Sequence, residues 1–93
     1  MAERHQAQVT RSDVLPVVAA RVGPIVGHTE YAAAGVAVFV PPTAPHPDGL
    51  EAAAAELEAG GCTVAVEDLG GADTRGRWRV TATKPDWELG AGR

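Results

Sequence analysis

The spacing of apolar positions predicts a first helix over residues 13–22. Ser12 supplies an N-cap and Asp13 an acidic residue in the first turn. Pro16 then falls within the first turn, where proline is tolerated, and the Gly-Pro pair at 23–24 ends the helix. Apolar residues at spacings of three, four and eight share one helical face, which comprises Val14, Val17, Val18, Val22 and Ile25.

A second helix is predicted over residues 49–59. Asp48 and Glu51 match a capping box at its start, and the glycine pair at 60–61 matches a C-cap. Its apolar face is formed by Leu50, Ala53, Ala54 and Leu57. Four prolines lie within residues 41–47, so we expect this segment to be a stiff, extended connector.

Three further runs predict strands. Residues 62–67 alternate between apolar and polar, and residues 76–83 alternate with Trp78 as an inward-facing core anchor. Residues 35–40 are apolar on both faces, which is typical of a strand covered on both sides. One face carries Val36, Val38 and Val40, and the other carries Ala37 and Phe39. Residues 27–30 are expected to be a connection, and residues 32–34 fit either an extension of the strand or a helical turn.

The resulting element order is α-β-α-β-β, which predicts an α+β fold of two layers. We expect a small mixed sheet of about three strands, with a right-handed crossover between parallel strands and both helices on one face. The chain divides into a lead-in or short edge strand (1–11), one α/β domain (12–85) and a C-terminal tail (86–93). The sequence contains no internal repeat.

Composition limits the compartment and the partners. The chain has 93 residues, which fit one domain, and a net charge of −4, which argues against broad binding to nucleic acid or anionic lipid. A single cysteine, Cys62, excludes a disulfide framework, and the polar N-terminus shows no signal peptide. Without a membrane-spanning apolar run, we expect a cytoplasmic protein. The excess of Arg over Lys and the abundance of Ala, Gly and Val indicate a bacterial or phage gene of high GC content.

No motif fixes a reaction, metal or cofactor. His5, His28 and His46 lack metal-ligand spacing, although His28 and Glu30 form a possible acid–base pair in a loop. Cys62 follows a helix C-terminus, whose dipole opposes a thiolate, so we interpret it as a small buried hydrophobe. We expect no cofactor.

Three arginines are candidates for anion binding. Arg75, Arg77 and Arg79 recur at a spacing of two and share one face of the last strand, where guanidinium groups could bind phosphate or carboxylate. The alternative is a solvated edge strand, charged against aggregation, with Arg77 or Arg79 paired to Glu67 across the hairpin.

The second face of the sheet is the main functional hypothesis. If both helices cover the valine side, Ala37, Phe39 and Ala65 form an apolar centre with an arginine rim, as interfaces often do. Trp87 either folds back on the domain or docks on another chain. We therefore predict a non-catalytic binding or assembly module, a homodimer or protein partner, that uses this open face. A nucleic-acid accessory protein and a small enzyme with an interface site are the alternatives.

Overall fold

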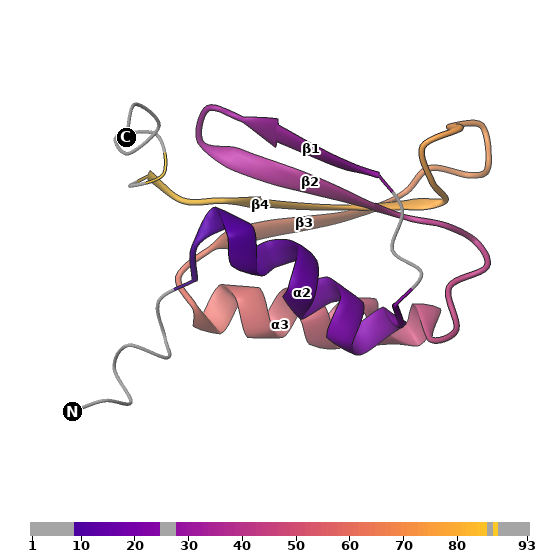
Figure 1. Ribbon diagram of the computed structural model, residues 1–93, viewed down its shortest axis with the longest axis horizontal. Coiled ribbons are helices and arrows are strands. Elements are labelled where there is room, and N and C mark those ends of the chain that lie inside the picture. Colours follow the sequence, from indigo (N-terminus) through magenta and orange to yellow (C-terminus); the bar gives the residue numbers. More distant parts are fainter. Residues whose placement is uncertain (1–8, 25–27, 86, 88–93) are drawn as a thin grey trace.

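Two helices and four strands occupy the part of the chain that the structure describes, residues 9–24, 28–85 and 87 of a computed structural model. Both helices lie on the same face of the sheet, which leaves the opposite face uncovered by either (Figure 1). The predicted two-layer α+β fold is thus confirmed. The elements are α2 (Arg11–Val22), β1 (Thr29–Ala32), β2 (Gly35–Val40), a short 3₁₀ turn η1 (Pro47–Gly49), α3 (Leu50–Ala59), β3 (Thr63–Asp68) and β4 (Trp78–Thr83).

The sheet is antiparallel throughout and has the order β1-β2-β4-β3. The prediction of a mixed sheet of about three strands is therefore corrected, because the sheet has four strands and each neighbouring pair is antiparallel. The crossover through α3 does join strands of the same direction, β2 and β3, but β4 lies between them and pairs antiparallel with both. The fourth strand, β1, covers residues predicted to be a connection (27–30) and the start of the stretch that fitted either a strand extension or a helical turn (32–34).

The observed element order is α-β-β-α-β-β, so the same α-β-β unit occurs twice. Each unit contributes one helix and one hairpin, and the inner strands of the two hairpins, β2 and β4, pair at the centre of the sheet. The sequence shows no corresponding repeat.

Helix α2 begins two residues earlier than predicted. Thr10, and not Ser12, is the N-cap, and its backbone N–H donates to the Asp13 carboxylate at 2.9 Å. Pro16 is therefore the sixth residue of the helix, beyond the first turn. Val14, Val18 and Val22 are fully buried, which confirms the predicted apolar face. Ile25 lies outside the described residues, as does most of the predicted lead-in strand.

Helix α3 begins without the predicted capping box. The turn η1 supplies backbone acceptors instead, because Gly49 N–H donates to the His46 carbonyl at 2.9 Å and Leu50 N–H to that of Pro47. The C-cap is confirmed, since Gly61 adopts φ 99° and lets Cys62 N–H reach the Leu57 carbonyl at 3.1 Å.

The connector at 41–47 is turned and not extended. Ala44 N–H donates to the Pro41 carbonyl at 3.1 Å, and His46 N–H donates to the Val22 carbonyl at 2.9 Å. The segment therefore folds back onto the end of α2 before α3 begins.

The core lies between the helices and the valine side of the sheet. Trp78 packs against this core but stays partly exposed at the start of β4. Among the described residues, the buried core comprises Val9, Val14, Val18, Val22, Val36, Val38, Val40, Ala44, Leu50, Ala53, Leu57, Cys62, Val80, Ala82 and Trp87.

The one buried charged side chain described is Lys84, which is 8% exposed. Its Nζ donates to the carbonyls of Val9 (3.2 Å) and Gly60 (3.4 Å), and it lies 5.9 Å from the centre of the Trp87 ring. Lys84 thus links the segment before α2, the end of α3 and the segment after β4.

Candidate interaction face

The face of the sheet opposite the helices has a centre of small side chains. Strand register aligns Ala37 of β2, Thr81 of β4 and Ala65 of β3 in one row across three strands. Directly paired residues of antiparallel strands share a face. The sequence therefore predicted this face correctly for Ala37 and Ala65. We call it the open face, and its described members are Glu30, Ala32, Ala37, Phe39, Thr63, Ala65, Glu67, Arg79, Thr81 and Thr83.

Phe39 lies on the open face, where it was predicted to form part of an exposed apolar centre. In the structure its side chain is fully buried. The Arg75 guanidinium sits 4.3 Å from the ring centre, and the Arg79 guanidinium 5.9 Å. The His28 ring is tilted against it at 5.8 Å. Cationic and aromatic side chains of the same chain thus cover Phe39.

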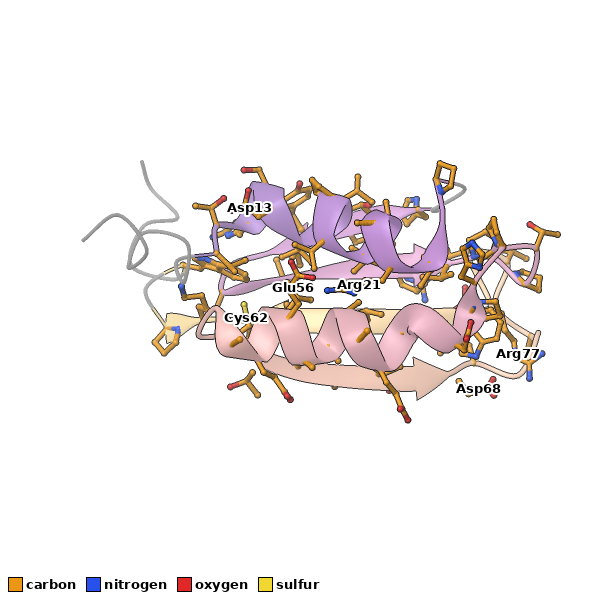
Figure 2. All side chains as sticks on the ribbon, turned by 90° about the horizontal axis from the view of Figure 1, so that it is seen from below. Asp13, Arg21, Glu56, Cys62, Asp68 and Arg77 are labelled. Atoms are coloured by element: carbon orange, nitrogen blue, oxygen red, sulfur yellow. The ribbon has the colours of Figure 1, made fainter. Side chains whose placement is uncertain are left out.

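Each of the three candidate anion-binding arginines contacts a carboxylate. Arg75 donates to Asp73 at 2.8 Å and to Glu30 at 3.1 Å. Arg77 donates to Asp68 at 2.7 Å (Figure 2), and Arg79 donates to Glu67 at 2.6 Å. The predicted pairing of Arg79 with Glu67 is confirmed. The edge-strand interpretation is wrong, because β4 lies inside the sheet and β3 at its edge.

Hydrogen bonds from Arg75 and Arg77 favour the ionised form of three carboxyl groups, those of Asp73, Glu30 and Asp68. Hydrogen bonds from Arg75 lower the pKa of Asp73 from 3.8 to about 2. The same guanidinium lowers the pKa of Glu30, and hydrogen bonding from Arg77 lowers that of Asp68. Only Arg79 lies in β4, whereas Arg75 and Arg77 precede that strand, so the prediction that all three share one face of the last strand is wrong. The positive charges of the three arginines are largely balanced within the chain.

The structure brings two of the predicted polar residues together. His28 Nε2 lies 3.0 Å from a Glu30 carboxylate oxygen, and Glu30 also receives the Arg75 contact. His46 lies elsewhere, exposed at the start of the turn before α3. The described residues contain no group of three or more metal-ligating side chains.

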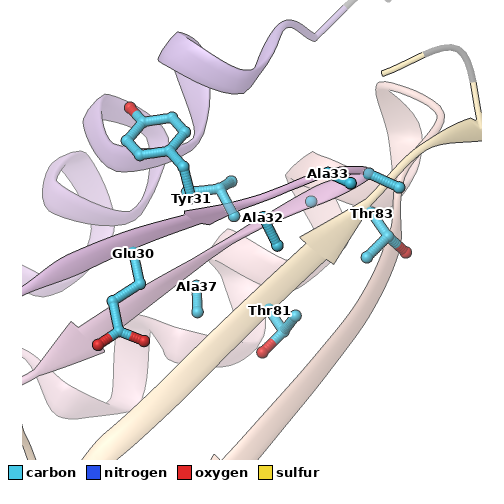
Figure 3. Close-up of a pocket in the computed structure, with 10 residues that line it drawn as sticks. Glu30, Tyr31, Ala32, Ala33, Ala37, Thr81 and Thr83 are labelled. Atoms are coloured by element: carbon cyan, nitrogen blue, oxygen red, sulfur yellow. The ribbon is translucent and has the colours of Figure 1, made fainter. Parts of the chain in front are cut away.

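A shallow hollow of about 390 Å³ opens beside this charged cluster (Figure 3). Glu30, Ala37 and Thr81 line it, and Thr83 continues the same wall. Figure 3 shows Tyr31 directed away from these side chains. The surface around this hollow is therefore nearly flat. It consists of methyl groups and threonine side chains, with the Glu30 carboxylate at its edge.

Trp87 takes the first of its two predicted alternatives. It is 7% exposed and belongs to the core on the helix side, with its carbonyl accepting from Arg11 at 2.9 Å. Its assignment as an interface residue is therefore corrected. Cys62 is also buried in this core (Figure 2).

The sequence did not reveal the role of Asp73, and it indicated Glu30 only as a neighbour of His28 and not as a partner of Arg75. Asp73 lies in a loop, and Glu30 is 45 residues from its partner Arg75. The alternation of Thr29-Glu30-Tyr31-Ala32 was the available signal for a strand, and it would have placed Glu30 on the face of Ala37.

Comparison with known proteins gives no further assignment. Neither the family models nor the curated proteins nor the solved structures contain a match to this chain. Among the described helices, none has the length and apolar composition needed to cross a membrane.

Proposed function

We propose that this protein is a non-catalytic assembly module that associates with a second copy of itself through the open face. The observation that carries the proposal is the row of small side chains around Ala37 and Thr81, which forms a low-relief surface on the side without helices. Such a surface lets a second sheet approach closely. Apolar atoms that remain exposed there would be buried by association.

Charge favours the open face over more acidic surfaces as the place where two copies meet. Two copies that each carry −4 repel one another, so their contact should lie where charges are locally balanced. On and beside the open face, three arginines are paired to four carboxylates. A two-fold interface brings the same patch from each copy together, which suits a patch that carries both signs.

The small size of the face limits the area that association can bury. Four strands spaced about 4.8 Å apart and about 20 Å long cover roughly 400 Å² in plan. A standard interface buries about 800 Å² per partner, so the dimer should be weak, with a Kd in the micromolar range or above. The assembly should therefore depend on protein concentration.

The test is the solution mass of a Thr81→Lys variant across a concentration series. Lysine at this central position sets two like charges opposite each other in a two-fold dimer, and we expect at least tenfold weaker association. Ala52→Lys on the exposed side of α3 changes the net charge equally and should leave association unchanged. Equal masses for both variants and the parent would contradict the open face as the interface.

The alternative functions have less support. A nucleic-acid phosphate would have to displace a carboxylate from Arg75, Arg77 or Arg79 before binding. An enzyme using His28 and Glu30 would need further polar groups, whereas the neighbouring ring is Phe39 and the neighbouring hollow is lined mainly by small side chains. Salt-dependent binding of DNA or RNA that is lost in an Arg77→Ala/Arg79→Ala variant would favour the nucleic-acid alternative.

A further inference from the structure

A second surface follows strand β3, which lies at one edge of the sheet. One side of β3 pairs with β4, and the other side has no neighbouring strand among the described residues. Val66 is 42% exposed here, one of two large apolar residues exposed in the described chain. Edge strands of this kind accept an additional strand unless something blocks them.

The backbone of β3 has a defined outward side. Leu69 N–H donates to the Arg77 carbonyl at 2.7 Å, which fixes the phase of the β3–β4 ladder. Hydrogen-bonded pairs alternate along antiparallel strands, so Ala65 and Glu67 turn their backbone groups towards β4. The N–H and C=O groups of Val64 and Val66 then lie on the outward side, available to an added strand.

An acidic hollow adjoins this edge. It has a volume of about 430 Å³ and lies between the start of α3 and the end of β3. Its polar walls are Asp48, Glu51 and Asp68, and its apolar walls include Val66 and the indole of Trp78. Carboxylates around an aromatic ring favour a cationic side chain.

Two residues of this hollow, Asp68 and Trp78, already contact a cation of the same chain, although that cation, Arg77, lines a different hollow. The Arg77 guanidinium donates to Asp68 at 2.7 Å and lies 5.5 Å from the centre of the Trp78 ring. Asp48 and Glu51 remain on the opposite wall and contribute further negative charge.

Charge argues against a second copy at this edge. Glu58 is seven residues after Glu51, so it follows on the same side of α3. Two copies paired through β3 would bring these glutamates of the two helices towards one another, at a like-charge cost. A basic partner would instead gain from the same charges.

We propose that the β3 edge, together with the acidic hollow, binds an extended peptide segment that carries lysine or arginine. The peptide adds a strand beside Val64 and Val66 and inserts a cationic side chain between Asp48, Glu51 and Trp78. This surface is separate from the open face, and the inference is independent of self-association.

The test uses a fluorescent octapeptide of alternating lysine and valine, with its binding measured by fluorescence anisotropy. A glutamate–valine octapeptide of the same length should bind at least tenfold more weakly. Two N-methylated forms of the lysine peptide are also prepared. One is methylated on the odd-numbered amides and the other on the even-numbered amides, so each form has one blocked edge. The form methylated on the side that pairs with β3 should bind about tenfold more weakly, because it cannot complete the ladder.

A pair of matched variants locates the site on α3. Glu51→Gln should weaken binding of the lysine peptide about fivefold, whereas Glu56→Gln should not, because Glu56 lies on the α2 side and contacts Arg21 at 3.1 Å (Figure 2). Equal binding of both methylated forms, or equal effects of the two variants, would overturn the proposal. Dissociation of a self-assembled form by the peptide would assign the edge to a second copy and would also overturn it.

Discussion

Close contacts constrain single residues of this protein. They limit the size of the side chain at one position and pair opposite charges at another. Gly49 shows this at the junction of the two helices, because a Cβ atom built there would lie 2.1 Å from the Arg21 carbonyl oxygen. Arg75 shows it on the open face, where one guanidinium covers Phe39 and pairs with two carboxylates. Both features join segments that are far apart in the sequence.

Gly49→Ala should lower the free energy of unfolding by about 2–3 kcal/mol, because the added methyl group meets backbone that cannot move independently. Gly49 has φ −75°, so the loss is steric and not conformational. Urea denaturation measures it. Gly70→Asn is the control, since its position has open space and asparagine tolerates positive φ. Equal losses for both variants would argue against the close approach.

Asp73 should titrate with a pKa of about 2, and Arg75→Gln should raise that value towards 3.8. The folded-state pKa lies below the unfolded one, so the stabilisation is present above about pH 4 and is lost as the pH falls towards 2. Carboxyl chemical shifts followed by NMR give both values. An unchanged pKa in the variant would show that Arg75 is not its cause.

At the scale of elements, the sequence predicted both helices and three of the four strands. Periodicity sufficed where an element buries one face, as with Val14, Val18 and Val22 in α2. It failed for β1, whose pattern is short and whose hairpin turn is Ala33-Ala34. The position of β4 inside the sheet follows from long-range pairing, which local spacing cannot reveal.

Lys84→Met should destabilise the fold by about 1–3 kcal/mol, because the carbonyls of Val9 and Gly60 lose a buried donor. The side chain keeps a similar length, so the change tests hydrogen bonding more than packing. Thermal unfolding measures the loss. An unchanged midpoint would show that the buried ammonium gains nothing over an apolar group.

The whole molecule presents two surfaces, the open face and the β3 edge, which differ in charge and in shape. The open face has small side chains and paired charges, while the hollow beside the β3 edge is lined by Asp48 and Glu51 as well as by Asp68, which pairs with Arg77. The sequence predicted the position of Ala37 and Ala65 on the open face, because strand alternation is local. It did not predict that Phe39 would be covered, since that depends on Arg75 in a distant loop and His28 before β1.

We propose that two copies meet through the open face, and sedimentation equilibrium of the unmodified protein from low to high micromolar concentration is the decisive measurement. We expect a concentration-dependent rise from the 9.6 kDa monomer towards twice that mass, with the rise abolished by Thr81→Lys and retained by Ala52→Lys. A constant mass of 9.6 kDa over the whole range would contradict it.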